Sequence, residues 1–358
     1  MNLNSIYFKK HQLNYMGNKR ALLNHINNVI IDIKQKLNKD LLISLDGFSG
    51  TGIVARLLKY HSTKLYVNDL ENYSCIINQA YLSNPSKHKI KQINSWIDKM
   101  NNIPLNKTDG IIRKYYSPEN DQNIKIHDRA FYTNQNALII DNIRFHIDKI
   151  PKSIRPYIMA QLLIKAGIHV NTSGVFKGFY KDTKTKIGKF GGNKQHDIKR
   201  IMGKINLEYP IYSNQKHKVD VEILCGDINE HIKQINNLDI AYYDPPYNQH
   251  PYGSNYFLLN TIIQNNIDYN NISKISGISK DWKRSKYNYK DNQINLFKNL
   301  IQNTDSKFII IAYSNQGFLN HTEWKNHILK DYTYTYITIP YKKGVTEIMY
   351  IIDKRQKK

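Results

Sequence analysis

The residues best equipped for chemistry in this sequence are Asp244-Pro245-Pro246-Tyr247, which combine a carboxylate, two stiff prolines and an aromatic ring. They end the apolar run 238–243, whose length and aromatic and β-branched content predict a buried strand. Because prolines cannot donate ladder hydrogen bonds, the strand should stop there. Open α/β sheets bind ligands at that edge. Taken alone, the motif is equally consistent with a strand-ending turn.

A second cluster is the glycine-rich turn Asp46-Gly47-Phe48-Ser49-Gly50-Thr51-Gly52. The apolar run 41–45 leads into it, and a helical pattern over 53–60 follows it. Glycines permit a tight turn and a close approach of the backbone to a ligand. The turn approximates a dinucleotide-binding fingerprint, whereas a phosphate-binding P-loop would need Gly-Lys-Ser/Thr, which is absent. The motif is weak by itself, because glycine-rich turns are common.

Two further carboxylates end predicted strands. Asp69 closes the run 64–69, 17 residues after Gly52, where a carboxylate can accept hydrogen bonds from a ribose. A helix N-cap is the alternative role for Asp69. Asp227 closes the run 219–227 and could accept a hydrogen bond from an adenine amine. A lone Asp after a glycine is more often a turn residue, so this assignment depends on the surrounding motifs.

The elements that must position these residues alternate between strands and helices, which predicts an α/β fold with a mostly parallel sheet. Further strands are expected at 307–315, 333–339 and 347–352, the last two as a hairpin, and helices at 22–33, 74–82, 257–266 and 295–303. The alternation weakens over about 90–205, which reads as an inserted region with a helical stretch at 136–170. The polar, tyrosine-rich segment 268–293 is expected to be an exposed loop.

The net charge of +23 and the pI near 9.6 favour a polyanionic partner, although codon bias toward Lys and Asn offers a compositional alternative. A basic, glycine-rich loop follows residue 174. Its cations form a credible phosphate-contact set, with a merely solvated loop as the alternative: Lys177, Lys181, Lys184, Lys186, Lys189, Lys194 and Arg200.

Several classes of protein are disfavoured. No window is apolar over the roughly 18 residues that a membrane span needs, and residues 1–10 lack the apolar core of an export signal. Cys75 and Cys225 show no metal-ligand spacing, and no metal site is expected. We therefore expect a cytoplasmic protein with reduced thiols.

The order of the motifs is more specific than any one of them. Tyr15-x-Gly17-x-Lys19, Phe48-x-Gly50-x-Gly52, a basic insertion and Asp244-Pro245-Pro246-Tyr247 follow one another along the chain. In this order the sequence resembles the D12-type (α-group, Dam-like) N6-adenine-specific DNA methyltransferases, over about 1–80 and 215–350. The middle matches only loosely.

The resemblance implies a Rossmann-like sheet that binds S-adenosylmethionine, with an inserted, mainly helical target-recognition domain. It divides the chain into a first catalytic part (1–90), a DNA-binding region (91–205) and a second catalytic part (206–358). The implied cofactor-binding residues are Tyr15, Gly17, Lys19, Asp46, Gly47, Phe48, Ser49, Gly50, Gly52, Asp69, Asp227, Ile228 and Asp244.

The catalytic motif suits the implied reaction. An adenine N6 amine is conjugated with its ring and is a poor nucleophile, so two acceptors on its N–H bonds would favour a more nucleophilic nitrogen. Asp244 and the carbonyl of Pro245 supply such acceptors, Pro246 stiffens the loop, and Tyr247 offers a face for stacking the flipped base. Tyr252 and Tyr256 belong either to the target-base pocket or to the packing around it.

The implied function is site-specific methylation of duplex DNA, with a cognate restriction endonuclease as a candidate partner. An RNA adenine methyltransferase and a non-catalytic DNA-binding protein with the same fold remain the alternatives. A nicotinamide-dependent oxidoreductase would explain the glycines but neither Asp-Pro-Pro-Tyr nor the charge. The sequence leaves the oligomeric state open.

Overall fold

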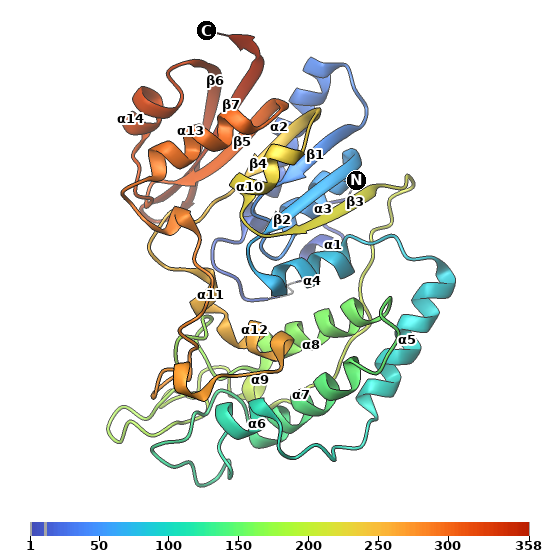
Figure 1. The fold of residues 1–358 in the computed structure, drawn as a ribbon, viewed down its shortest axis with the longest axis vertical. Helices are drawn as coiled ribbons and strands as arrows, with labels where there is room; N and C mark the ends of the chain where they lie inside the picture. Colours follow the sequence, from blue (N-terminus) through green and yellow to red (C-terminus); the bar gives the residue numbers. More distant parts are fainter. Residues whose placement is uncertain (1, 11–12, 358) are drawn as a thin grey trace.

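The computed structural model describes residues 2–10 and 13–357 and contains a seven-stranded sheet beside a layer of helices (Figure 1). The strand order is β3-β2-β1-β4-β5-β7-β6. The first five strands in this order run parallel, and β7 is antiparallel to both β5 and β6. The strands are β1 (Leu42–Asp46), β2 (Ser62–Asp69), β3 (Asp220–Cys225), β4 (Leu238–Tyr243), β5 (Ser306–Ser314), β6 (Tyr332–Lys342) and β7 (Val345–Lys357).

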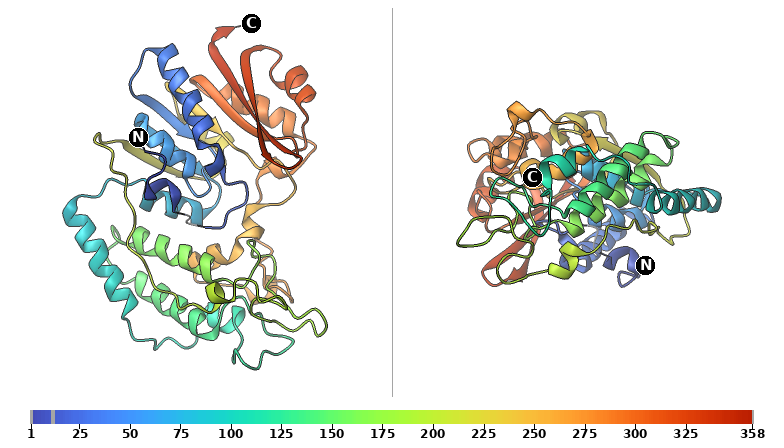
Figure 2. Two further views of the ribbon diagram at one scale, coloured as in Figure 1. Left: turned by 180° about the vertical axis from the view of Figure 1, so that it is seen from behind. Right: turned by 90° about the horizontal axis from the view of Figure 1, so that it is seen from below.

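The central strands are buried on both faces. Along β4, Ile240 and Tyr242 pack in one hydrophobic cluster with α2 and α3, whereas Ala241 and Tyr243 pack in another with α10 and α13. This alternation explains the continuous apolar run that the sequence shows there. The rear view shows α2 and α3 in front of the sheet (Figure 2). The helices near the sheet are α1 (Ile6–Lys9), α2 (Leu23–Leu37), α3 (Ile53–Tyr60), α4 (Asn72–Tyr81), α10 (Ile228–His231), α13 (Gln293–Asn303) and α14 (His321–Glu323).

The remaining helices form a second layer below the carboxyl edge of the parallel strands (Figure 1). Its hydrophobic core joins residues of α4, α5, α7, α8 and α12, so the layer draws on segments far apart in the sequence. Its helices are α5 (Lys87–Asn101), α6 (Ile111–Tyr116), α7 (Asn134–Ile147), α8 (Arg155–His169), α9 (Ile198–Met202), α11 (Tyr252–Asn255) and α12 (Phe257–Gln264).

The structure confirms the α/β class, the mostly parallel sheet and the terminal hairpin. It corrects the single helical stretch expected over 136–170, which is two helices, α7 and α8, separated at Pro151. Proline lacks the N–H that would continue the helix. No helix within residues 2–10 and 13–357 is both long enough and apolar enough to cross a membrane.

Candidate active site

The carboxyl ends of β1, β2, β3 and β4 surround one cavity, which we call the edge cavity. Asp46 ends β1, Asp69 ends β2, Asp227 follows β3 and Asp244 follows β4, and all four line it. The sequence-predicted residues that line the edge cavity are Tyr15, Gly17, Lys19, Asp46, Phe48, Ser49, Gly50, Asp69, Asp227, Ile228, Asp244, Pro246 and Tyr252. Gly47, Gly52, Pro245, Tyr247 and Tyr256 lie around it without lining it.

The glycine turn is shaped by backbone that only glycine adopts readily. Gly50 and Gly52 have φ values of +50° and +76°. At Gly52 a Cβ atom would lie 1.8 Å from Oδ1 of Asn78, far inside contact distance. The Gly50 amide donates to Asp69 Oδ2 at 2.7 Å, so the turn is fastened to the end of the neighbouring strand.

Asp69 and Asp227 both carry protein hydrogen bonds in addition to facing the cavity. Asp69 also accepts from the Glu71 amide at 2.9 Å, and burial raises its pKa. Asp227 caps α10 by accepting from the Asn229 amide at 3.0 Å, and it pairs with Lys286 Nζ at 3.0 Å. Both carboxylates therefore shape the wall, and each oxygen keeps lone-pair capacity for a ligand.

Asp46 is the least satisfied acid of the site. Its side chain is 1 % exposed, and no side chain of the described residues hydrogen-bonds to it. Burial, together with the nearby Asp244 and Asp69, raises its pKa well above the usual range. A cationic group in the edge cavity would relieve this cost.

Lys19 forms a buried ion pair with Asp244. Its Nζ lies 2.9 Å from Asp244 Oδ1 and 3.9 Å from Glu347 Oε1, with only 4 % of its side chain exposed. Burial alone would lower the pKa of Lys19, but the two carboxylates outweigh burial and the pKa is raised. Burial raises the pKa of Asp244, and Lys19 opposes that shift. Lys19 is thus the counter-ion of Asp244, beyond the cofactor role that the resemblance implies.

A second space, the outer cavity, lies against the same wall. Lys19 and residues 15–18 line both cavities, whereas Tyr247 and Glu347 line only the outer one. Residues 173–175, which open the basic loop, complete its rim. The Asp-Pro-Pro-Tyr loop therefore has Asp244 in the edge cavity and Tyr247 in the outer cavity.

Tyr252 and Tyr256 stack against Tyr15 rather than line the outer cavity. Their ring centroids lie 4.9 Å and 4.8 Å from that of Tyr15, with interplanar angles of 19° and 24°. The Tyr256 hydroxyl accepts from the Met16 amide at 2.9 Å, and its side chain is buried. This arrangement favours the packing alternative and shows what holds the segment 15–17 between the two cavities.

Sequence reasoning missed part of the edge cavity. Residues 284–288 line it, although the segment 268–293 was expected to be an exposed loop. Tyr287 is 1 % exposed because its ring packs edge-on against Phe48, and its hydroxyl donates to Asn229 Oδ1 at 2.9 Å. Glu71 also lines the cavity, and burial raises its pKa to about 7. No periodic pattern marks these residues, so only their tertiary placement reveals them.

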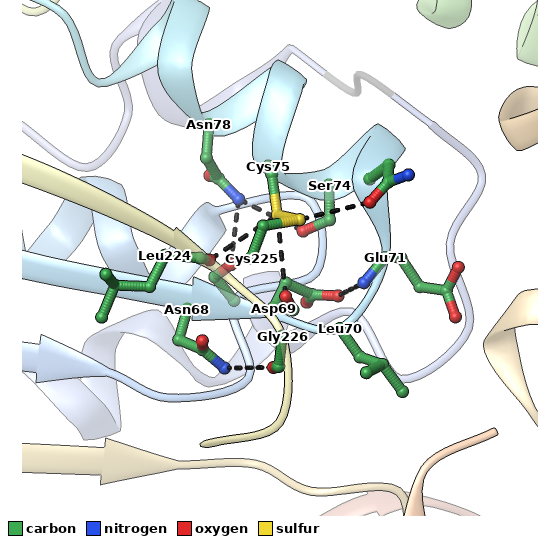
Figure 3. The surroundings of a disulfide bond; sticks show 12 residues. Asn68, Asp69, Leu70, Glu71, Ser74, Cys75, Asn78, Leu224, Cys225 and Gly226 are labelled. Atoms are coloured by element: carbon green, nitrogen blue, oxygen red, sulfur yellow. Dashed lines mark hydrogen bonds between the residues drawn. A yellow bond between two sulfur atoms is a disulfide. The ribbon is translucent and has the colours of Figure 1, made fainter. Parts of the chain in front are cut away.

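The two cysteines do not remain thiols, which corrects the expectation of reduced thiols. Cys75 on α4 and Cys225 at the end of β3 form a disulfide, with their Cα atoms 6.0 Å apart (Figure 3). They meet because β3 lies beside β2, whose end leads directly into α4. The disulfide lies next to Asp69 and Gly226 (Figure 3). It therefore links α4 to the end of β3 beside the part of the edge cavity that Asp69 lines.

The predicted DNA-contact cations divide into two groups. Lys177, Lys184, Lys186 and Lys194 are exposed, whereas Lys181 and Lys189 are half-buried and Lys189 lies 3.5 Å from Asp182. Arg200 instead holds the backbone, because its guanidinium donates to the carbonyls of Val170 and Thr172. The exposed lysines are thus the members of the set that are free to meet a phosphate backbone.

The sequence profile of the D12 class N6 adenine-specific DNA methyltransferases matches residues 15–320. The chain belongs to this family. The methyltransferase is also 27 % identical over 316 residues to the type II methyltransferase M.NlaIII of Neisseria lactamica, a match that covers 86 % of this chain and 85 % of that protein. It is an adenine-specific DNA methyltransferase by this membership.

Longer relatives match it as well. It is 29 % identical over 353 residues to the modification methylase StsI of Streptococcus sanguinis and 28 % identical over 346 residues to the type II methyltransferase M.FokI of Planomicrobium okeanokoites. Each match covers 92 % of the methyltransferase but only 48 % and 49 % of the relative, so the chain spans about half the length of these two proteins.

Proposed function

We propose that the methyltransferase moves a methyl group from S-adenosylmethionine to N6 of an adenine flipped out of duplex DNA, at a specific sequence. The observation that carries this proposal is the position of the Asp-Pro-Pro-Tyr loop, which has Asp244 in an acidic, glycine-bounded cavity and Tyr247 in a second cavity that shares residues 15–19 with the first. A cofactor in the first cavity and a base in the second would meet at this carboxylate.

The edge cavity suits the chemistry of the cofactor, which carries an ammonium, a sulfonium, a ribose and an adenine. When bound, S-adenosylmethionine supplies an electrophilic methyl group on its sulfonium sulfur. The unpaired Asp46 carboxylate suits a cation, the glycine turn permits close backbone approach, and Asp69 retains acceptor capacity for ribose hydroxyls. Asp227 and Ile228 are the proposed contacts of the cofactor adenine.

In the proposed mechanism the chain orients and polarises the target amine. Lys19 occupies Oδ1 of Asp244, and no further hydrogen bond to Asp244 occurs among the described residues, so Oδ2 is available to accept one N–H. The Pro245 carbonyl accepts the other. With both N–H bonds engaged, the nitrogen lone pair is directed away from the ring toward the edge cavity. Tyr247 stacks on the base, which is worth roughly 1–3 kcal/mol by analogy with single-strand binders.

The segment 91–205, which supplies most helices of the second layer and the basic loop, is the proposed DNA-binding region. The exposed Lys177, Lys184, Lys186 and Lys194 supply phosphate contacts. Because its relatives carry the names of modification methylases and type II methyltransferases, we also propose that this enzyme protects DNA from a cognate restriction endonuclease.

The test is methyl transfer from tritium-labelled S-adenosylmethionine to unmethylated genomic DNA, with total cellular RNA as the competing substrate. We expect label in N6-methyladenine of duplex DNA and none in RNA. Label in RNA alone would favour the RNA alternative, and no transfer to either acceptor by a cofactor-binding protein would favour a non-catalytic role.

A further inference from the structure

Glu347 is a buried acid that the proposed mechanism does not yet use. It lies near the start of β7, where it pairs with Ser314 of β5, and it is 4 % exposed. Since β5 also pairs with β4, this register brings Glu347 to the same sheet edge as Asp244. Its Oε1 lies 3.9 Å from Lys19 Nζ, and its Oε2 has no hydrogen-bond partner among residues 2–10 and 13–357.

Two carboxylates thus hold one buried ammonium. Lys19 Nζ also donates to the Gly17 carbonyl at 3.2 Å, which leaves the ammonium enclosed by Asp244, Glu347 and backbone. A buried carboxylate that lacks a full set of hydrogen bonds is expensive, and such groups gather where a site needs their charge. Lys19 Nζ lies closer to Asp244 than to Glu347, so Asp244 is its main partner and Glu347 is a second, weaker one.

We propose that Glu347 is a positioning residue for methyl transfer, which acts through Lys19 to keep the Asp244 carboxylate ionised and fixed in orientation. This inference rests on the proposed function. Asp244 must stay ionised to accept strongly from the amine, and it does so only while Lys19 carries its proton. Glu347 stabilises that proton. It also holds Lys19 against Oδ1, so that Oδ2 stays free for the base.

The titratable groups that face Glu347 come from several elements packed against it. Lys19 reaches it from the N-terminal segment, Asp244 and Tyr247 from the Asp-Pro-Pro-Tyr loop, Tyr242 from β4, and Tyr341 from β6 across the outer cavity. Lys19 is the only cation of this set. Burial raises the pKa of Glu347, Lys19 lowers it, and Asp244 raises it further, so the charge state of each neighbour affects the protonation of Glu347.

The decisive variant is Glu347→Gln, which keeps shape and removes charge. With one anion lost, the pKa of Lys19 should fall, so the enzyme should lose activity at a lower alkaline pH than wild type does. Single-turnover transfer to unmethylated genomic DNA should be within about fivefold of wild type at pH 7, and the deficit relative to wild type should widen by about twofold or more at pH 9.5. Cofactor and DNA affinities, measured separately at pH 7, should change by less than about threefold.

Asp353→Asn on the same strand is the matched control, because it removes a carboxylate paired with Arg355 and distant in register from Lys19. Its pH profile should match that of wild type. Glu347→Asp, which withdraws the charge by one methylene, should shift the alkaline limb by a smaller amount, and it serves as the test if Glu347→Gln does not fold.

The outcomes are separable. Equal rate ratios at pH 7 and pH 9.5 for every folded Glu347 variant would overturn the positioning role, because a purely structural defect does not move a titration. A wild-type enzyme that methylates no DNA would instead overturn the proposed function. DNA methylation by the wild type, combined with a loss of Glu347→Gln activity at lower alkaline pH, supports both the proposed function and the positioning role.

Discussion

Replacing Lys19 by methionine would remove the only cation that lies beside Asp244 among the described residues, while keeping a side chain of similar length. The ammonium is nearly inaccessible, with 4 % of its side chain exposed and 2.9 Å to Asp244 Oδ1. Breaking a buried ion pair by removing one partner typically costs about 3–5 kcal/mol of unfolding free energy while the other group stays charged. Asp244 can reduce that cost by taking up a proton, and Glu347, which loses the same counter-ion, can do likewise.

The loss should therefore depend on pH in a defined direction. Burial already raises the pKa of Asp244, and removing Lys19 raises it further. A group whose pKa is higher in the folded state stabilises fully below its unfolded pKa, and that contribution is lost as pH rises through the folded value. Relative to wild type, Lys19→Met should lose up to about 1.4 kcal/mol per pH unit for each carboxylate involved.

The methyl-transfer rate of Lys19→Met should change with pH in the opposite direction to its stability. In Lys19→Met a larger fraction of Asp244 should be protonated at a given pH, so the single-turnover rate should rise with pH, by up to about tenfold per unit, until that carboxyl ionises. Urea unfolding at pH 5.5, 7 and 8.5 and labelled methyl transfer at the same values measure the two effects. Lys36→Met, which breaks a surface pair with Asp32, is the control and should change stability by less than about 0.5 kcal/mol. A stability loss independent of pH, or a flat rate profile, would refute the counter-ion role.

Three further changes test other parts of the structure. Gly52→Ala should weaken cofactor binding and should destabilise the protein by more than the roughly 1–2 kcal/mol that a left-handed backbone costs a residue with a side chain. Gly178→Ala, whose added Cβ would meet nothing within 4 Å, should do neither. Equal urea midpoints for the two variants would contradict this. Without reductant, Cys75→Ser should lower the unfolding free energy by roughly 2–5 kcal/mol, and dithiothreitol should cause no further loss. A variant as stable as oxidised wild type would mean that the disulfide does not stabilise the fold. Neutralising three exposed lysines of the basic loop should reduce the slope of log affinity for DNA against log salt by about 2–3. The residues to change are Lys184, Lys186 and Lys194, and an unchanged slope would place the DNA elsewhere.

The sheet was predictable because burial on both faces leaves a local signature. The runs ending at Asp46, Asp69 and Asp244 are short and apolar, and acids or prolines terminate them. These features place carboxylates at one sheet edge without further information. The interruption at Pro151 was also encoded locally, and the helical periodicity on either side of it concealed the break.

The rest of the site depends on contacts across the fold. Lys19 and Glu347 are 328 positions apart and meet only because β7 inserts between β5 and β6. Tyr287 looks like one more polar-loop tyrosine until its ring packs against Phe48. Cys75 and Cys225 are likewise joined by strand order rather than by spacing. Sequence pattern specifies which face a residue takes, but it does not specify which distant partner that face meets.

The central claim is that Asp244 activates an adenine amine for methylation. Its most direct test is single-molecule sequencing of DNA from a host lacking adenine methylation that expresses either wild-type protein or Asp244→Ala. We expect N6-methyladenine at one defined sequence motif with the wild type, and none above background with a folded Asp244→Ala protein. Substantial methylation by the variant at the same motif would contradict the claim.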